Sequence, residues 1–339
     1  MTWISVWGID EAKLMLDASY GAVRVEDTLD RIGLQFWTIQ EDGGVDFFSN
    51  ADEETARWFI ERGHATGKKI LGTVVNQQFD WGVTRGALGD GGGVAVASKL
   101  AAVVDEYDLD GIDIDFETGS PQAGDREDFA AFIVALSAEL KARDKLLTIN
   151  SFYTESNGAP GPLWWSDWVG LVDTIQVMGY DKTSWSGPGA AGYQALQDRA
   201  VEAGFKANQL LLGLPAWLDA WGAAGAEPPT NVDNLRFITH CLKKPTGVAI
   251  WSLSDPLSRS LPNRQLPWST EEVWQSLLEL HDGVTVDEEF CRANEREADV
   301  IDDMSALALN HAGGIWLAVS DYWSRPSTET ALASEVLMS

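Results

Sequence analysis

Short apolar runs alternate along the chain with longer stretches in which apolar residues recur every three or four positions. The short runs are rich in β-branched residues, as in strands, and the longer stretches have the period of amphipathic helices. Strands that alternate with helices predict βα units around a parallel sheet. The expected strands are Trp3–Ile9, Ile32–Ile39, Lys69–Asn76, Gly111–Glu117, Leu146–Phe152, Thr174–Tyr180 and Gln209–Pro215. Helical patterns between them cover Glu53–Thr66, Val94–Tyr107, Arg126–Ala142 and Gln194–Ala203.

One more unit completes a (β/α)8 TIM barrel, an α/β fold, and two segments can supply its closing strand. The first is Gly247–Ser254, which a helix-like stretch Thr270–His281 follows, and the second is Gly313–Ser320. If the first segment closes the barrel, residues 1–282 form the catalytic barrel and residues 283–339 a C-terminal extension packed on it. If the second does, residues 218–312 form an insertion after the seventh strand. The pattern leaves both arrangements open.

Residues Asp110–Glu117 combine strict alternation with an unusual density of acids. Side chains on a strand alternate between its two faces, so one face carries only apolar residues and the other only carboxylates. The apolar set is Ile112, Ile114 and Phe116, and the acidic set is Asp113, Asp115 and Glu117. Neighbouring carboxylates repel one another, so at least one pKa should rise, which suits an acid at neutral pH. We therefore interpret this segment as a catalytic strand.

The acidic segment has two other interpretations. A half-buried edge strand with a solvated acidic face has the same alternation. A calcium-binding EF-hand loop needs glutamate at its twelfth position, where this chain has Gly124. The calcium loop is therefore excluded, and catalysis is favoured over the solvated strand.

Polar and aromatic residues gather where other expected strands end, and active sites of such barrels lie at that face. Gln176, Met178 and Tyr180 share one face of the sixth strand, and Asp181 follows it. Tryptophan faces pack well against sugar rings, although a single tryptophan is more often part of a core. The tryptophans at or just past expected strand ends are Trp37, Trp81, Trp185, Trp217 and Trp251. Their shared position predicts a carbohydrate cleft.

Composition narrows the range of partners. The formal net charge of -28 argues against nucleic acid, because phosphate binding needs clustered Lys and Arg. The four histidines are scattered, so we expect no metal site and no cofactor. We expect no membrane-spanning segment, no signal peptide at the start of this chain, and a monomer. Cys241 and Cys291 can form one disulfide or remain two thiols, and two cysteines do not fix the compartment.

The chain resembles family 18 glycoside hydrolases, which include chitinases and endo-β-N-acetylglucosaminidases. Asp110–Glu117 matches the family's DGxDxDxE motif at every fixed position, and Met178–Asp181 matches its M-x-Y-D pattern. Gly247–Ser254 is similar to the family's closing strand, with Trp251 in the register of its sugar-stacking tryptophan. Trp316 falls earlier in the register of the second candidate strand.

The resemblance implies retaining hydrolysis in which the substrate's own acetamido group is the nucleophile. It implies that Glu117 is the general acid, that Asp115 and Tyr180 orient the acetamido group, and that Asp113 shares a proton with Asp115. Trp251 is then the floor under the sugar. Asp181 and Gln176 are expected to hold hydroxyl or acetamido groups, with Met178, Trp37, Trp81, Trp185 and Trp217 as further substrate contacts.

The resemblance leaves several substrates and one other class of function open. Chitin or a chito-oligosaccharide comes first, because the sixth strand is chitinase-like and the rim is rich in tryptophan. The chitobiose core of N-glycans comes second, because Leu71–Asn76 lacks the usual serine and paired glycines of chitinases and Thr118 follows Glu117. Peptidoglycan comes third. The other class is a non-catalytic lectin of the same fold, which usually lacks the acid that is present here as Glu117.

Overall fold

The structure of the 339-residue chain is a computed structural model. It describes residues 1–117, 122–153, 160–178, 189–215, 231–244, 246–253, 274–275, 277–278 and 288–292. These residues belong to one compact unit, Met1–Arg292.

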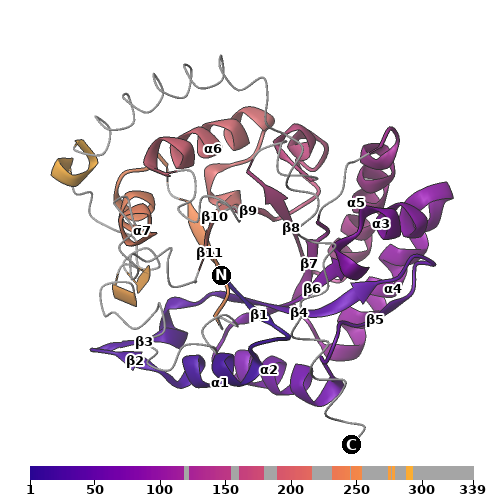
Figure 1. The fold of residues 1–339 in the computed structure, drawn as a ribbon, viewed down its shortest axis with the longest axis horizontal. Coiled ribbons are helices and arrows are strands. Elements are labelled where there is room, and N and C mark those ends of the chain that lie inside the picture. Colours follow the sequence, from indigo (N-terminus) through magenta and orange to yellow (C-terminus); the bar gives the residue numbers. More distant parts are fainter. Residues whose placement is uncertain are drawn as a thin grey trace, which may run out of the picture. The chain divides into compact units, whose positions relative to one another are not determined.

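Eight parallel strands form a closed ring, seen along its axis in Figure 1. Their order is β1, β4, β6, β7, β8, β9, β10 and β11, and β11 pairs with β1 to close the ring. The register of the closure joins Thr2 of β1 to Ile250 on one side and to Ile32 on the other. The strands are β1 Thr2–Ser5, β4 Arg31–Ile39, β6 Lys69–Asn76, β7 Gly111–Asp115, β8 Leu146–Phe152, β9 Thr174–Met178, β10 Leu210–Pro215 and β11 Gly247–Trp251. The expected (β/α)8 barrel is thus confirmed.

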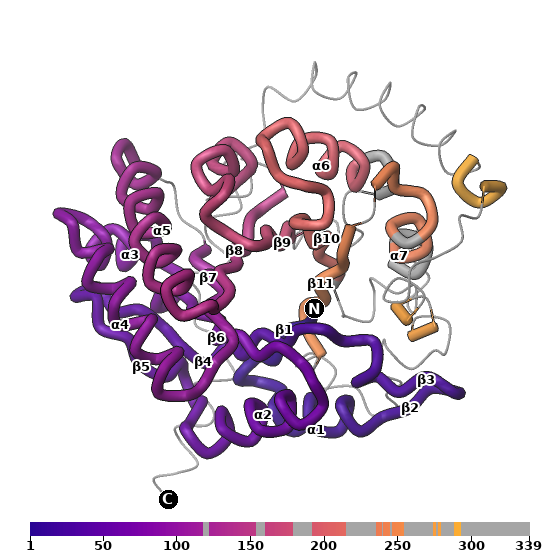
Figure 2. Tube along the Cα trace, turned by 180° about the vertical axis from the view of Figure 1, so that it is seen from behind, coloured from indigo at the N-terminus to yellow at the C-terminus, as the bar shows by residue number. Residues whose placement is uncertain are grey.

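Helices surround the ring, as Figure 2 shows from the opposite side. They are α1 Ile9–Asp17, α2 Glu53–Ala65, α3 Trp81–Leu88, α4 Gly92–Tyr107, α5 Asp125–Lys141, α6 Gly189–Ala203 and α7 Asn231–His240. Short strands β2 Ser19–Tyr20 and β3 Val23–Arg24 form a hairpin, and β5 Val45–Phe47 runs antiparallel to the end of β4. Asp52 begins α2 by accepting a hydrogen bond from the Thr55 N–H at 2.7 Å, which satisfies one free donor of the first turn.

The hydrophobic core lies between the strands and the helices. Ile112, Ile114 and Phe116 point outward from β7 and its end, and each is at most 1% exposed. Phe116 stacks on Phe132 of α5, with ring centroids 5.9 Å apart. Burial of each such side chain contributes about 1.5–3 kcal/mol to folding. The alternation of the sequence therefore leaves the acidic face of β7 inside the ring.

The closing strand resolves the choice between the two candidate segments. Gly247–Trp251 lies between β10 and β1, so this segment is the eighth strand. The second candidate, Gly313–Ser320, lies outside the described residues, as does most of Thr270–His281. The boundary at residue 282 and the packing of the extension from residue 283 stay predictions.

Several boundaries differ from the sequence-based expectation. The first strand ends at Ser5, and Ile9 begins α1 instead of ending a strand. Helices α1, α3 and α7 were not expected. The structure also shows that 81–107 is long and apolar enough for a membrane span by length and composition, contrary to our expectation. That stretch is divided here, because Asp90 has a φ of 52° between α3 and α4.

Candidate active site

Three acids lie in a row along β7 and just beyond its end. Asp113 and Asp115 belong to the strand, and Glu117 follows it by two residues. Asp113 is fully buried, Asp115 is 3% exposed, and Glu117 is half-buried. The row therefore runs from the interior of the barrel toward the carboxyl ends of the strands, where barrel active sites lie.

Asp113 is held by four donors from three other strands, β1, β6 and β8. Its Oδ2 accepts from Trp3 Nε1 at 2.8 Å, Thr73 Oγ1 at 2.9 Å and Asn150 Nδ2 at 3.1 Å. Its Oδ1 accepts from Thr148 Oγ1 at 2.6 Å. Burial raises the pKa of Asp113, and the four donors oppose this rise by stabilising the carboxylate. These contacts fix the position of the carboxyl group deep in the barrel.

Asp115 has fewer donors and more like charge around it. Gln35 Nε2 donates to its Oδ2 at 3.0 Å. Burial raises the pKa of Asp115 well above its ordinary value, and the charges of Glu117 and Asp113 raise it further. The expected pKa rise within the acidic segment is thus found, and it falls on Asp113 and Asp115. A carboxyl group at this position tends to keep its proton.

Glu117 is held through its main chain. Asn76 Nδ2 donates to the Glu117 carbonyl oxygen at 3.0 Å, and the Glu117 N–H donates to Asn76 Oδ1 at 3.0 Å. Asn76 is the last residue of β6 and is fully buried. Residues 118–121 lie outside the described part of the chain.

Two indoles meet inside the barrel beside the acids. Trp251 ends β11 and is half-buried, and its ring centroid lies 5.9 Å from that of Trp3. Trp3 passes across Gly33, where a Cβ atom would approach Trp3 Cδ1 to 2.7 Å and Thr73 Oγ1 to 2.6 Å. Glycine at position 33 therefore leaves the room that Trp3 needs to reach Asp113.

The other expected site residues fall into three groups. Gln176 and Met178 lie on β9 and are buried, and Gln176 Oε1 has no hydrogen-bond partner among the described residues. Trp37 and Trp81 are 2% and 1% exposed within the hydrophobic core, a position that does not favour sugar contact, and their role as substrate contacts stays a prediction. The predictions that fall outside the described residues concern Tyr180, Asp181, Trp185 and Trp217.

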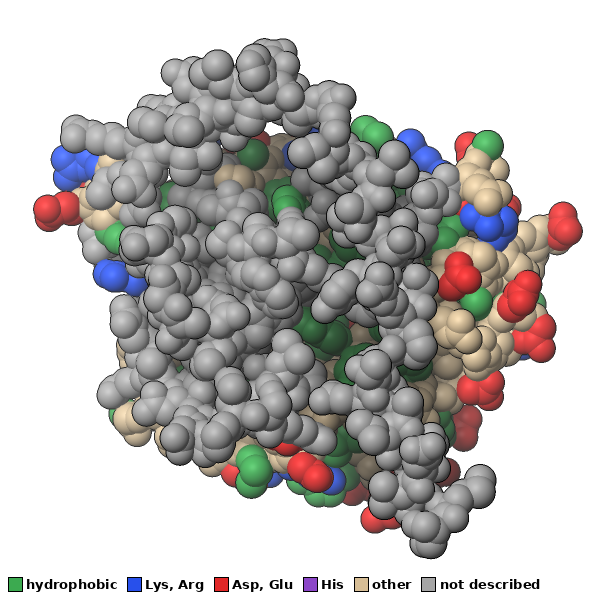
Figure 3. Space-filling view, viewed as in Figure 1, with side chains coloured by type: hydrophobic (Ala, Val, Ile, Leu, Met, Phe, Trp, Pro, Cys, Tyr) green, Lys and Arg blue, Asp and Glu red, His purple; other side chains and the backbone are tan. Residues whose placement is uncertain are grey.

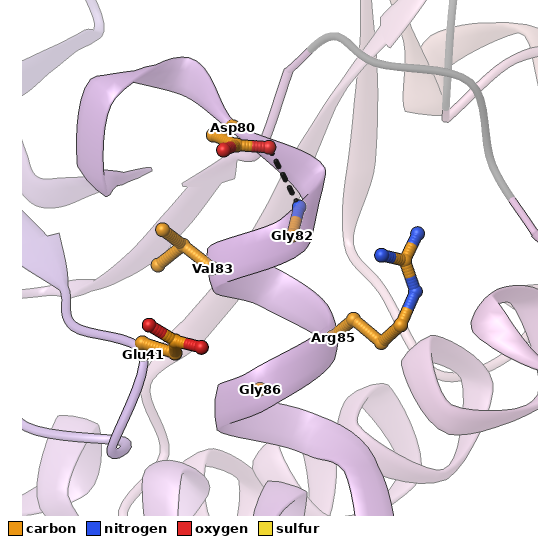
Figure 4. A pocket seen from close by; sticks show the side chains of 6 residues that line it. All are labelled: Glu41, Asp80, Gly82, Val83, Arg85 and Gly86. Atoms are coloured by element: carbon orange, nitrogen blue, oxygen red, sulfur yellow. Dashed lines mark hydrogen bonds between the residues drawn. The ribbon is translucent and has the colours of Figure 1, made fainter.

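A groove of about 440 Å³ lies along α3, close to the loops that follow β4 and β6. Figure 4 shows Glu41 and Val83 on one side of the helix and Arg85 directed to the other side. Arg85 forms a two-pronged ion pair with Asp125 at 2.8 Å for each contact. Figure 3 shows Asp and Glu side chains gathered along the edge of helices α3 to α5. None of the expected site residues lines this groove.

The residues that the sequence analysis missed support the acids from other strands of the barrel. They are Trp3, Gln35, Thr73, Asn76, Thr148 and Asn150. The available signal was a polar residue at every second position of β8, where Thr148 and Asn150 alternate with buried Leu147 and Ile149. Among the described residues, no group of three or more His, Cys, Asp or Glu side chains could hold a metal ion.

Comparisons with known proteins agree with this geometry. Similar solved structures include a class V chitinase from Pseudomonas fluorescens Pf-5 (18% identity, TM-score 0.61, 81% of this chain and 97% of that one). A chitinase from Flavobacterium johnsoniae is similar at 15% identity and a TM-score of 0.60, over 85% of this chain and 96% of that one. A chitinase from Chromobacterium violaceum ATCC 12472 is similar at 15% identity and a TM-score of 0.59, over 83% of this chain and 98% of that one.

These structural likenesses establish the barrel fold, and the sequence match establishes the family. No curated protein sequence matches the chain. The model of the glycosyl hydrolases family 18 matches residues 92–286, which is more than half of the chain and includes the acid row. The chain therefore belongs to family 18 of the glycosyl hydrolases.

Proposed function

We propose that this glycoside hydrolase cleaves β-1,4 bonds next to N-acetylglucosamine by a retaining, substrate-assisted reaction, with chitin or chito-oligosaccharides as the first candidate substrates. The observation that carries the proposal is Asp115, buried between Asp113 and Glu117 with a raised pKa. One proton shared by Asp113 and Asp115 leaves the pair with one negative charge, and this charge disfavours ionisation of Glu117 and so helps to keep it an acid. The similar structures are those of chitinases, which also supports this substrate class.

In the proposed first step, Glu117 gives its proton to the glycosidic oxygen as the bond to the anomeric carbon breaks. The oxygen of the substrate's own acetamido group attacks that carbon, and an oxazolinium ion forms. Asp115 accepts a hydrogen bond from the acetamido N–H, and Tyr180 donates one to the acetamido oxygen. In the second step the Glu117 carboxylate takes a proton from water as the water oxygen attacks the anomeric carbon. The oxazolinium ring opens, and the product retains the configuration of the substrate.

Trp251 is proposed as the floor beneath the reacting sugar. Its position at the end of β11, half-buried and facing the interior beside Trp3, supports this role. Gln176 and Met178 on β9 are proposed as deeper substrate contacts, and Gln176 Oε1, which has no partner in the described part of the chain, offers an acceptor. Asp181, Trp185 and Trp217 stay proposals from the sequence.

The acid role of Glu117 has a direct test. Glu117→Gln keeps the shape of the side chain but cannot donate the proton, so turnover should fall by about 10²–10⁴-fold. Ligand binding should stay close to that of the parent protein, as measured by calorimetry with chitotetraose. Glu127→Gln on the exposed first turn of α5 is the matched control and should keep full turnover. Retention of more than about a tenth of turnover by Glu117→Gln would exclude this role.

Substrate assistance has a separate test. A substrate with an unsubstituted amino group on the sugar at the cleaved bond has no carbonyl oxygen to attack the anomeric carbon. We expect no cleavage after that sugar, and inhibition by a thiazoline analogue of the oxazolinium ion. Efficient cleavage after glucosamine would indicate a nucleophile from the protein instead.

A second candidate function is cleavage of the chitobiose core of N-glycans. It is favoured by the unusual third strand, where Asn76 ends β6 and contacts Glu117. Product analysis after incubation with chitotetraose, an N-glycoprotein and peptidoglycan separates these substrates. A lectin would bind one of them without forming product.

A further inference from the structure

Asn76 makes a double hydrogen bond that resembles one step of a strand ladder. Its amide nitrogen donates to the Glu117 carbonyl oxygen and its amide oxygen accepts from the Glu117 N–H, both at 3.0 Å. One side chain thus pairs both polar groups of a single peptide residue. Asn76 is fully buried, so its side of both bonds is shielded from water, while the Glu117 side is partly exposed.

The position of this double bond gives it a specific consequence. The ladder between β6 and β7 ends at the pair Val75 and Asp115, so Glu117 lies beyond the last paired residue. Through the Asn76 side chain, β6 is hydrogen-bonded to the neighbouring chain two residues beyond the end of the ladder. The same strand also fixes Asp113 through Thr73 Oγ1 at 2.9 Å. Strand β6 therefore contacts the acid row at both of its ends.

We propose that Asn76 is a positioning residue that sets where the Glu117 carboxyl group meets the glycosidic oxygen. This inference rests on the proposed role of Glu117 as general acid. Asn76 acts through the Glu117 main chain and does not itself touch the substrate. It lies in the strand whose sequence, Leu71–Asn76, differs from that of chitinases.

If Glu117 is misplaced, the rate of cleavage should fall most for a leaving group that depends most on protonation. A sugar hydroxyl leaves as a strongly basic alkoxide unless it is protonated, whereas a nitrophenol leaves readily as the anion. Loss of Asn76 should therefore slow cleavage between two sugars and spare cleavage of a nitrophenyl glycoside. A loss of general stability would affect both substrates equally.

The test compares Asn76→Ala with Gln197→Ala on two substrates, chitotetraose and the nitrophenyl glycoside of N,N′-diacetylchitobiose. Gln197, which lies on the outer helix α6, is the matched control. Its side-chain amide is also buried and donates to a main-chain carbonyl, that of Lys244, at 2.8 Å. For Asn76→Ala we expect kcat on the tetramer to fall by about 10–100-fold, with KM changed less than about twofold. On the nitrophenyl glycoside kcat should fall less than about threefold. Gln197→Ala should leave the ratio of the two rates unchanged.

A second variant guards against misfolding. Asn76→Leu keeps the branched shape of the side chain and removes both hydrogen bonds, so it should show the same selective loss. Equal losses on both substrates, or losses no larger than those of Gln197→Ala, overturn the inference. If Glu117→Gln loses tetramer cleavage while both Asn76 variants keep it, only the inference fails. If Glu117→Gln keeps tetramer cleavage, the proposed function fails and the inference with it.

Discussion

Two carboxyl groups in this protein have pKa shifts of opposite direction, because their surroundings and their partners both differ. Asp115 is 3% exposed and Asp125 is 5% exposed. Burial raises the pKa of Asp115, and the charges of Glu117 and Asp113 raise it further. Burial also acts to raise the pKa of Asp125, but the Arg85 guanidinium and the Gln122 N–H outweigh it and hold the pKa below its usual range.

These opposite shifts predict opposite effects of asparagine on stability. The pKa of Asp115 is higher in the folded than in the unfolded state. Its carboxyl group therefore contributes fully to the free energy of unfolding below the unfolded pKa of about 3.9, and this contribution is lost as pH rises through the folded pKa. Asp115→Asn should therefore raise the free energy of unfolding at neutral pH, by about 1–3 kcal/mol, with the gain vanishing toward pH 4. Asp125→Asn should lower the free energy of unfolding at neutral pH, because it removes the ion pair with Arg85. The loss should be only about 1–2 kcal/mol, since Arg85 is partly exposed, and it should shrink as pH falls through the folded pKa of Asp125. Urea unfolding of both variants across this pH range is the measurement, and shifts of the same sign would contradict the argument.

At the scale of single elements, β4 shows why Trp37 packs in the core. Strict alternation from Gly33 and Gln35 places Trp37 inside the barrel. The register of β4 against β6 shifts between Leu34 and Trp37, so one extra residue interrupts the alternation. Trp37 then packs among Phe47 and Tyr107, with ring centroids 5.7 and 5.6 Å away. A bulge has no clear local signal in this sequence, so alternation alone did not predict this position of Trp37.

Other elements could be predicted because one local pattern determined them. Lys69–Asn76 and Leu146–Phe152 have the bounds that their apolar runs predict. The acid row was also predictable, because its side chains lie two residues apart on one strand. The Trp3 bond to Asp113 joins residues 110 positions apart, so it depends on barrel closure, which no local pattern describes.

Strand β11 carries a prediction that tests both the sugar platform at Trp251 and the core position of Trp37. Removal of an aromatic platform should cost about 1–3 kcal/mol of binding, by analogy with bases stacked on aromatic side chains. Trp251→Ala should therefore weaken oligosaccharide binding and turnover together. Trp37→Ala should lower the free energy of unfolding by about 3–5 kcal/mol and leave the affinity of the folded protein unchanged. Calorimetry and thermal unfolding of both variants decide this, and a binding loss confined to Trp37→Ala would contradict both assignments.

At the scale of the whole molecule, the end of the described chain is tied to the barrel by a covalent bond. Cys241 and Cys291 form a disulfide with 50 residues of sequence separation, which settles the alternative of two free thiols in this structure. Arg236 of α7 also lies over the Phe290 ring at 4.8 Å. The closed loop contains β11, so this bond and the closure of the barrel constrain the same stretch of chain.

Removal of this disulfide should therefore lower global stability without changing the chemistry at the acid row. A cross-link that closes a loop of this length restricts the unfolded chain, and its loss typically costs about 2–4 kcal/mol. We expect the double variant Cys241→Ser, Cys291→Ser to lose stability of this size in urea unfolding, and the parent protein with reductant to show the same loss. Turnover of chitotetraose, measured well below the lowered melting temperature, should match that of the parent protein, because neither cysteine contacts Asp113 or Asp115. A variant as stable as the oxidised parent would show that the bond does not constrain the unfolded chain, and a selective loss of turnover would place the disulfide in the support of β11 and Trp251.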